Sequence, residues 1–564
     1  MARSVALDWL AHNELPGVSQ MIYNRSPRPT WWLPYFYAGG AIALASTGVL
    51  LSEAFVSAPA PAAAALQFIL SVFVAEIPLN IGLHWLHHQK EAEPATPRRT
   101  PLTKVLVNYN LKAHGVTEIE TCFQNATAVL ELCDVHLCIV STTTDTMLRS
   151  MEKSLASTMK QKYKEHFHYL YRRSTVLRKC GNYQDLIAFC GGSNDADTLF
   201  NYDASTPNIR HLQSLNMQYT LVMDSDNVIT KDSLRALVET AEREFEYCIF
   251  QPRIQLINER TFYQHIQATI HNLHIHSICG VFDAFRHAPF FGKGLIRNVP
   301  YFEKVIEPCK IPTFALSHDT IESALLPTYF VGHASLYESV PRSHVDWSIR
   351  EERWNAGDII ACVYLLHPRR ALENRFQRLF FATAATRVLV CRPILLAFLL
   401  LGLERDSAGT LAALVFCFTT VLLTTLVALL ATNAQHKLYT SRRVIAAFAC
   451  AQIFHATEPI TGSMRLLRSL WRAGSVITNT PTTHWIPSSL IEERIREMGD
   501  FKSALNEFWL SSVLALVVLY HFHGSVGACI FAGATLVLPF TTWVTTYTKY
   551  PALVCTELGD ELRV

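Results

Sequence analysis

The stretch Tyr219-Thr-Leu-Val-Met-Asp224-Ser-Asp226-Asn227 decides the fold of this chain. Its first five residues are apolar, aromatic or β-branched, which is typical of a buried strand, and two carboxylates follow where that strand ends. Three further runs of this kind lie at residues 104–109, 135–141 and 247–252. The sequence therefore predicts a sheet built from several short strands.

Helix-favouring segments separate these runs, at residues 117–131, 147–163 and 231–245. Strands that alternate with helices predict a parallel or mixed α/β sheet covered on both faces. In such sheets ligands bind beyond the carboxyl ends of the strands. We therefore expect residues 100–375, which have normal polarity, to form one α/β domain that carries the chemistry.

The composition indicates a protein that is only partly soluble. Half of its 564 residues are hydrophobic and 17% are charged, whereas an average soluble protein has about 25% charged residues. The net charge of +2 provides no long-range field for a polyanion, which argues against a nucleic-acid binder. The 14 cysteines form no CxxC pair, so we expect reduced, buried thiols and no disulfide framework or zinc site.

Apolar runs at both ends of the chain predict a multi-pass membrane protein. A bilayer core takes roughly 20 helical residues. Six candidate spans are found at residues 31–51, 61–85, 382–403, 410–431, 506–520 and 526–545. Basic residues flank them on one side, which by the positive-inside rule places both termini and the central domain in the cytosol. Residues 444–471 mix apolar side chains with Glu458 and Arg465, which favours an amphipathic helix at the membrane interface.

This gives three predicted regions. Residues 1–99 hold a cytosolic segment and two transmembrane helices, and residues 100–375 form the cytosolic domain. Residues 376–564 form a membrane region with about four transmembrane helices and the interfacial helix near 444–471.

Asp224 and Asp226 are candidates for a site that binds a divalent cation. Two carboxylates two residues apart present hard oxygen ligands to Mg2+ or Mn2+ bridging a diphosphate. The alternative is a strand-end turn that caps the helix beginning near Asp232. Upstream, Lys179 beside Gly181 offers a cation for pyrophosphate, although solvated surface is the usual environment of such a cluster.

Two later motifs supply the remaining chemistry. In Ser317–Glu322 the carboxylate of Asp319 could take a proton from a sugar hydroxyl, and Glu322 lies on the same helical face. The alternative is a helix start at which Ser317 or Asp319 acts as a cap. In the segment 350–354 guanidinium groups and an indole suit a departing diphosphate and a stacked sugar, and the alternative is a salt-bridged amphipathic helix.

The order of these motifs resembles the processive inverting glycosyltransferases of family 2. In that family a GT-A domain, a Rossmann-like nucleotide-diphospho-sugar transferase fold, is inserted between transmembrane α-helices. Within it, the likeness is greatest to the bacterial glucosyltransferases that make osmoregulated periplasmic glucans. The residues that carry it are RKCGN at 178–182, VMDSDNVITKD at 222–232, LSHDTIESAL at 316–325, YESVP at 337–341 and REERWNAGD at 350–358.

The resemblance implies a role for each matching residue. Asp319 would be the general base, and Asp224 and Asp226 would hold the nucleotide and the metal. The other donor contacts would be Lys179, Asn182, Arg350 and Arg353, and the acceptor would be bordered by Trp354, His318 and Glu322. The implied activity is that of a hexosyltransferase that polymerises glucose from UDP-glucose into a β-glucan, β-1,2-linked in the nearest likeness. The lipid bilayer would be its second partner, because the growing chain would cross it.

The sequence departs from the family pattern at two places. Leu111 follows Asn110 where the family usually has a glutamate, and Ser141–Thr144 stand where an aspartate contacts the nucleoside, so that this contact is lost or moved to Asp145. Three alternatives therefore stay open. They are the same fold with another UDP-sugar, such as N-acetylglucosamine or a mixed polymer, an inactive transferase-like membrane scaffold, and a transporter without catalysis.

Overall fold

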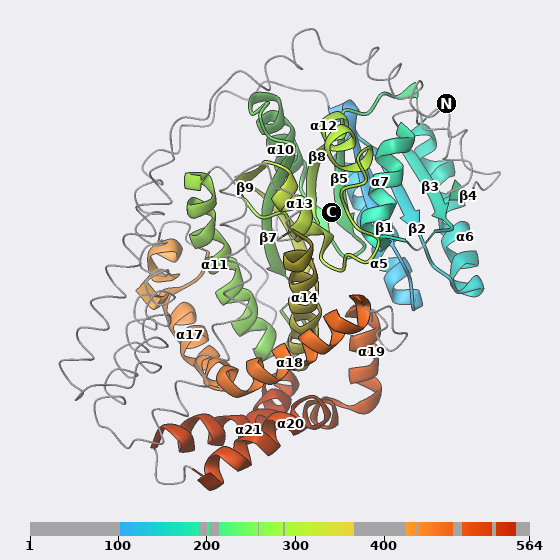
Figure 1. Cartoon of the computed structure of the whole chain (residues 1–564). Coiled ribbons are helices and arrows are strands. Elements are labelled where there is room, and N and C mark those ends of the chain that lie inside the picture. The colour runs from blue at the N-terminus through green and yellow to red at the C-terminus, as the bar shows by residue number, and fades with distance from the viewer. Residues whose placement is uncertain are drawn as a thin grey trace. The chain divides into compact units, whose positions relative to one another are not determined.

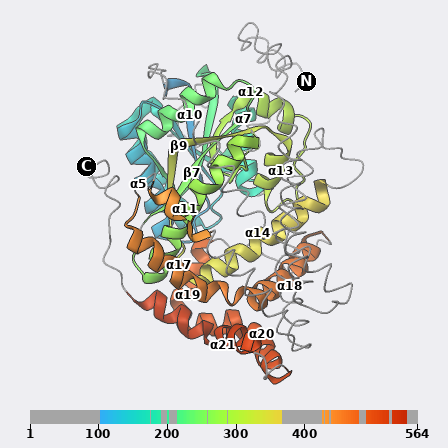
Figure 2. The same ribbon diagram turned by 90° about the vertical axis from the view of Figure 1, so that its left-hand side faces the viewer.

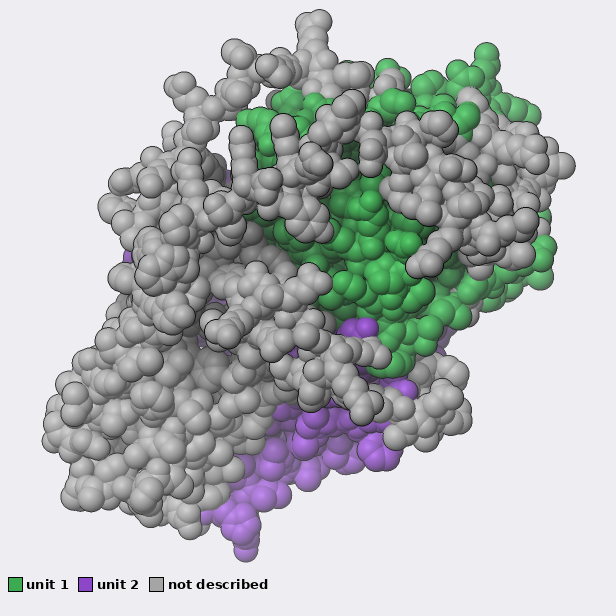
Figure 3. Space-filling model, turned by 45° about the horizontal axis from the view of Figure 1, so that its top comes forward, with its two compact units in different colours: residues 1–28, 92–255, 285–338 green, residues 29–91, 256–284, 339–564 purple. Residues whose placement is uncertain are grey.

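The computed structural model describes residues 102–174, 176–190, 200–201, 212, 214–257, 259–285, 288–365, 425–427, 429–434, 438–477, 488–521 and 526–548. The chain divides into two compact units, coloured separately in Figure 3. Unit 1 comprises residues 1–28, 92–255 and 285–338, and unit 2 comprises residues 29–91, 256–284 and 339–564. Residues 256–284 and 339–365, which lie inside the predicted domain 100–375, therefore cluster with the C-terminal helices.

A mixed sheet of nine strands, in the order β4-β3-β2-β1-β5-β8-β7-β9-β6, forms the centre of unit 1 (Figure 1). Strands β3, β2, β1 and β5 run parallel, whereas β8 pairs antiparallel with β5 and β7. The α/β class predicted from the alternation of strands and helices is confirmed. The strands are β1 (Val105–Leu111), β2 (His136–Ser141), β3 (Phe167–Arg172), β4 (Phe200–Asn201), β5 (Tyr219–Asp224), β6 (Val228–Ile229), β7 (Ile249–Ile257), β8 (Gly294–Arg297) and β9 (Thr328–Ser339).

Helices cover both faces of this sheet. Alternate residues of β1, such as Val107 and Tyr109, pack in one core with α5, α6 and α10, while Leu106 packs in a second core with α7. Because β1 is covered on both faces, all of its residues are buried, and its sequence is mostly apolar. The helical segments of unit 1 are η1 (Leu102–Lys104), α5 (Val116–Leu132), α6 (Thr146–Tyr163), η2 (Lys164–His166), α7 (Arg178–Cys190), α10 (Lys231–Arg243), α12 (Asn298–Tyr301), the π-helical η3 (Phe302–Ile306) and α13 (His318–Leu325).

Unit 2 is helical. Two of its described segments, Asp500–His521 and Cys529–Tyr547, are long and apolar enough to cross a membrane. They belong to α20 and α21, which lie side by side in Figures 1 and 2 and agree with the last two predicted spans. Residues 31–51, 61–85 and 382–403, and most of 410–431, lie outside the described residues. The helices are α11 (Phe262–Phe285), α14 (His344–Leu365), α17 (Ser441–His455), α18 (Glu458–Ile477), α19 (Ser488–Met498), α20 (Asp500–His521) and α21 (Val526–Tyr547).

The predicted interfacial helix at 444–471 is two helices and not one. α17 ends at His455, α18 begins at Glu458, and their axes differ by 60° across this short break. By length and composition the bent pair could also form one broken span. Pro459 explains the break, because it has no N–H to donate to the carbonyl of His455 four residues earlier, and its ring favours the first turn of a new helix.

Candidate active site

The turn after β5 holds the two aspartates of the sequence motif. Asp224 ends the strand, and its backbone N–H donates to Asn227 Oδ1 at 2.8 Å while Asn227 N–H donates to Asp224 O at 3.1 Å. Tyr109 of β1 donates to Asn227 O at 3.0 Å, and Asn227 is fully buried. The turn is therefore fixed to the carboxyl end of the parallel strands, where the sequence predicts a ligand site.

Two lysines contact the Asp224 carboxylate. Lys179 Nζ lies 2.5 Å from Oδ1, and Lys293 Nζ lies 3.4 Å from Oδ2 and also pairs with Glu338. Burial acts to raise the pKa of Asp224, but the two ammonium groups outweigh it and hold this pKa well below its usual range. The structure thus brings the predicted Lys179 to the predicted Asp224. It adds Lys293 and Glu338, which the sequence interpretation missed.

The register of the sheet explains this convergence. Because β8 runs antiparallel to β5 with Gly294 opposite Val222, Lys293 lies at the carboxyl end of β5. Glu338 reaches the same edge because its neighbour in β9, Tyr337, pairs with Val228 of β6. In the sequence, Lys293 is distinguished only by the glycines on either side of it, Gly292 and Gly294. Close packing requires the second of these, because an added Cβ on Gly294 would lie 2.7 Å from Phe250 O.

Lys179 is placed by the start of α7. Gly181, in the same first turn, leaves room for the buried Arg172, since a Cβ there would collide with the Arg172 guanidinium and with Val176 O. Arg172 in turn pairs with Asp185 of α7. Asn182 follows Lys179 by three residues, and its buried Oδ1 has no hydrogen-bond partner within the described part of the chain. Asn182 thus has an acceptor available for a ligand, as its predicted donor-binding role requires.

Asp319 lies in the first turn of α13 and is half-buried. Burial raises the pKa of its carboxyl group, His318 and Lys179 oppose this rise, and Glu322 adds to it. Gly292, with φ near +70°, passes close by, because a Cβ on it would lie 3.7 Å from Asp319 Cβ. The segment that carries Lys293 therefore runs between the two aspartate motifs, and it places the candidate base next to the candidate diphosphate site.

Glu322 and His318 differ in exposure. Glu322 is fully buried and accepts hydrogen bonds from Tyr183 (2.6 Å) and Tyr301, while its other oxygen lies 2.8 Å from His318 Nδ1. Cys180 lies near enough for Cys180, His318 and Glu322 to form a potential metal-binding group. However, the two tyrosines and the histidine already satisfy the carboxylate. This burial does not favour the predicted acceptor contact by Glu322, and His318 is the more exposed of the two.

Arg350, Arg353 and Trp354 lie on α14 in unit 2. Arg350 pairs with Asp346 at 3.0 Å and with Glu492 at 3.1 Å, so the salt-bridged helix of the alternative interpretation is present. Arg353 is 4% exposed, and burial lowers its pKa to about 10. Trp354 is 44% exposed and meets Trp347 edge to face. These residues are grouped on one helix, and their roles toward donor and acceptor stay predictions.

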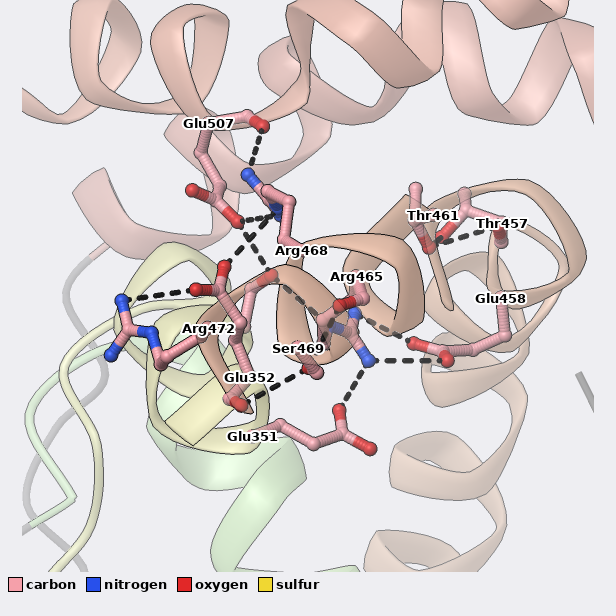
Figure 4. A network of polar contacts seen from close by, with 11 residues as sticks. Glu351, Glu352, Thr457, Glu458, Thr461, Arg465, Arg468, Ser469, Arg472 and Glu507 are labelled. Carbon is pink, nitrogen blue, oxygen red and sulfur yellow. Dashed lines mark hydrogen bonds and ion pairs between the residues drawn. The ribbon is translucent and has the colours of Figure 1, made fainter. Parts of the chain in front are cut away.

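An ion network joins α14 to α18 and α20 (Figure 4). The fully buried Arg465 pairs with Glu351 of α14 and, at 3.2 Å, with Glu458 at the start of α18. One turn on, Arg468 pairs with Glu352 at 3.2 Å and with Glu507 of α20 at 2.6 Å, and Arg472 lies 3.0 Å from Glu352. The helix that carries Arg350, Arg353 and Trp354 is therefore connected by ion pairs to a candidate membrane span.

The two departures from the family pattern have structural roles. Leu111 is buried in the core of unit 1. Asp145 caps α6, since its carboxylate accepts from Leu148 N–H at 2.9 Å. Thr143 Oγ1 accepts from Ala113 N–H at 2.9 Å and donates to the buried Glu152 at 2.5 Å. Asp145 is thus engaged as a helix cap, and it remains at the carboxyl end of β2.

Asp224 and Asp226 fit a divalent cation by the nature of their ligand atoms. Both offer carboxylate oxygens, which Mg2+ and Mn2+ prefer, and the Asp224 side chain is 33% exposed and so reachable. A cation that binds through Asp224 also meets the two ammonium groups that face its oxygens, and their positive charge opposes its binding.

Comparison with known proteins agrees with this geometry. Residues 219–431 match the family model "Glycosyl transferase family group 2". The cyclic beta-(1,2)-glucan synthase NdvB of Rhizobium meliloti is 26% identical over 237 residues, which is 37% of this chain. The match spans only 8% of the length of that relative.

Two solved structures are similar at low scores. A mannosyltransferase from Pyrobaculum calidifontis, in complex with GDP-Man and Mn2+, has a TM-score of 0.40 and 14% identity over 72% of this chain and 98% of its own. TarS residues 1–349 from S. aureus have a TM-score of 0.29 and 9% identity over 68% and 94%. The expected resemblance to the glycosyltransferases of family 2 is confirmed by the family match, which begins at the first residue of β5 and extends to residue 431.

Proposed function

We propose that this protein is a membrane-bound glycosyltransferase that polymerises glucose from UDP-glucose into a β-glucan. The observation that carries the proposal is the grouping of Asp224, Lys179 and Asp319 at the carboxyl ends of the parallel strands. This grouping combines a carboxylate for a cation, a cation for a diphosphate and a carboxylate for an acceptor hydroxyl. The family match supports glycosyl transfer as the reaction class.

In the proposed mechanism Asp319 accepts the proton of the acceptor hydroxyl as that oxygen attacks the anomeric carbon of the donor. The bond from that carbon to the diphosphate breaks with inversion, so no covalent enzyme intermediate is needed. Lys179 stabilises the negative charge that develops on the leaving diphosphate. A Mg2+ or Mn2+ ion held by Asp224 and Asp226 would add Lewis-acid stabilisation of the same charge.

The donor and the linkage are proposed from the likeness to the cyclic beta-(1,2)-glucan synthase. Glucose and β-1,2 linkage are the first choices for this reason. Asp145, at the end of β2, and the neighbouring hydroxyls of Ser141–Thr144 would meet the nucleoside in place of the aspartate usual in the family.

A lipid bilayer is the second proposed partner. The faces of α20 and α21 expose large apolar side chains, including Trp509 and Phe540, each more than half exposed. Such surfaces are costly in water and favourable in hydrocarbon. We propose a multi-pass protein whose membrane helices guide the chain outward, with residues 100–375 and both termini in the cytosol.

The direct test incubates detergent-solubilised protein with UDP-glucose and Mg2+ or Mn2+ and measures released UDP and polymeric glucose together. The matched control is Asp319→Asn, which keeps the size of the side chain and removes the base. Polymer from the unmodified protein alone would support the synthase. A panel of other donors, UDP-N-acetylglucosamine included, separates the glucan synthase from a relative with another sugar.

An inactive scaffold is the second candidate function, because Leu111 is buried and Asp145 serves as a helix cap. It predicts no turnover with any donor and no binding of UDP. Turnover with one donor would exclude it.

A further inference from the structure

We propose that Lys293 is an internal counter-ion of the donor site, which holds Asp224 before the donor binds and turns to the diphosphate when it arrives. The proposal rests on the proposed function, since it assumes a nucleoside diphosphate at Asp224. Its consequence is that the diphosphate and the divalent cation bind with strong mutual dependence.

The position of Lys293 supports this role. Its Nζ lies 3.4 Å from Asp224 Oδ2 and also pairs with Glu338, while the side chains of Lys293 and Glu338 are 16% and 18% exposed. The site is thus partly desolvated, which strengthens charge interactions, yet it is open to a ligand. Lys293 has two acidic partners, so it can leave Asp224 and remain paired with Glu338.

The backbone on either side of Lys293 is fixed. Phe290 N–H donates to Ser323 Oγ of α13 at 2.7 Å, and Phe291 N–H donates to Gln251 Oε1 of β7 at 2.9 Å. Gly294 begins β8, where a side chain would meet Phe250 O. The Lys293 ammonium group can therefore change partners by side-chain rotation, without movement of the segment that passes Asp319.

The charges determine the order of events. Each oxygen of Asp224 faces an ammonium group, so a dication that approaches alone meets two positive charges, which oppose its binding. A diphosphate is attracted by the same two ammonium groups and draws them away from Asp224. It also supplies oxygen ligands for the dication. Each ligand therefore raises the affinity of the other, and this coupling is reciprocal.

Three substitutions test the role of Lys293 through binding and not through turnover. Lys293→Met removes the charge and keeps the length of the chain. Lys293→Arg keeps the charge. Glu338→Gln removes the second partner of Lys293 and so strengthens its hold on Asp224. Mn2+ binding without nucleotide, and UDP binding with and without Mn2+, are measured by titration calorimetry on the full chain in detergent, with GDP as a second nucleotide.

The variants are expected to move Mn2+ affinity in opposite directions. Lys293→Met should bind Mn2+ alone about tenfold or more tightly than the unmodified protein and bind UDP alone more weakly, so that the coupling falls. Glu338→Gln should bind Mn2+ alone more weakly, and Lys293→Arg should resemble the unmodified protein. A merely structural role would not give opposite shifts, and thermal unfolding of each variant identifies any that fails to fold.

The outcomes separate this inference from the proposed function. If the unmodified protein binds UDP with Mn2+ and Lys293→Met leaves Mn2+ affinity and coupling unchanged, the counter-ion role is overturned and the proposed function stands. The same conclusion follows if Mn2+ does not change UDP binding at all. If the unmodified protein binds neither nucleotide, both proposals fail together.

Discussion

Asp224 and Asp319 are the two carboxylates to which the proposed function gives different roles, and their surroundings differ. Two lysines hold Asp224 in its ionised form, whereas burial makes the Asp319 carboxyl easier to protonate than an ordinary aspartate. The ionised Asp224 is suited to bind a cation, and Asp319 is suited to accept a proton.

Substitution of these two residues should therefore separate binding from transfer. Asp319→Asn is expected to bind UDP with nearly unchanged affinity and to lose transfer by at least two orders of magnitude, the usual size of a general-base contribution. Asp224→Asn is expected to lose Mn2+-dependent UDP binding itself. Calorimetry and released UDP measure the two effects, and equal loss of UDP binding in both variants would contradict the assignment.

The raised pKa of Asp319 also predicts a pH profile. A general base must be ionised, so the transfer rate should fall as the pH drops through the pKa of Asp319. Because this pKa lies above the usual value of about 3.9, the acid limb should begin at a higher pH than for an ordinary aspartate. The rate at saturating donor, measured from pH 4 to 8, tests this; a rate that stays constant down to pH 4 would argue against Asp319 as the base.

At the scale of elements, α18 connects α14 to α20 within unit 2. It contacts α14 through Arg465 and Arg472 and reaches α20 through Arg468 (Figure 4). A shift of α18 along its axis would leave these charges without their partners, which disfavours other registers of the three helices. The position of Arg353 and Trp354 is thus set by α18 as well as by their own helix.

Removal of Arg465 should be costly. Arg465→Met would leave Glu351 and Glu458 without the cation that they share, and breaking a buried pair in this way costs about 3–5 kcal/mol. The exposed pair of Lys162 with Glu131 provides the control, because solvent-screened surface pairs contribute little to stability. Thermal unfolding in detergent compares Arg465→Met with Lys162→Met, and an equal loss of stability would show that the network does not hold these helices.

At the scale of the whole molecule, the two units divide the proposed work. Unit 1 carries the aspartates, lysines and the mixed sheet, while unit 2 carries α14 and the two candidate spans α20 and α21. This division suits a reaction in which a soluble donor is consumed and a polymer is passed to a membrane.

The predicted topology can be tested at Cys309, an exposed thiol in unit 1. If unit 1 is cytosolic, a membrane-impermeant maleimide should label Cys309 only after the cells are permeabilised, as read from the peptide by mass spectrometry. Cys309→Ser, which removes the labelled peptide, is the matched control. Labelling of Cys309 in intact cells would place unit 1 outside and overturn the cytosolic assignment.

The local features of this protein follow from short stretches of its amino-acid sequence. The apolar runs of β1, β2 and β5, the aspartates at the end of β5 and the start of α13 at His318 are set by neighbouring residues, and so is the presence of the apolar helices α20 and α21. These features depend on side-chain pattern, strand-end chemistry and helix length, each of which a short window of sequence contains.

Which distant residues meet depends on the tertiary structure. Lys293 reaches Asp224 because β8 inserts antiparallel beside β5, and Glu338 reaches it through the pairing of β9 with β6. The full burial of Glu322 depends on Tyr183 and Tyr301, which come from other elements. Sheet order and strand direction are set by the packing of the whole domain, and no local pattern in the sequence encodes them.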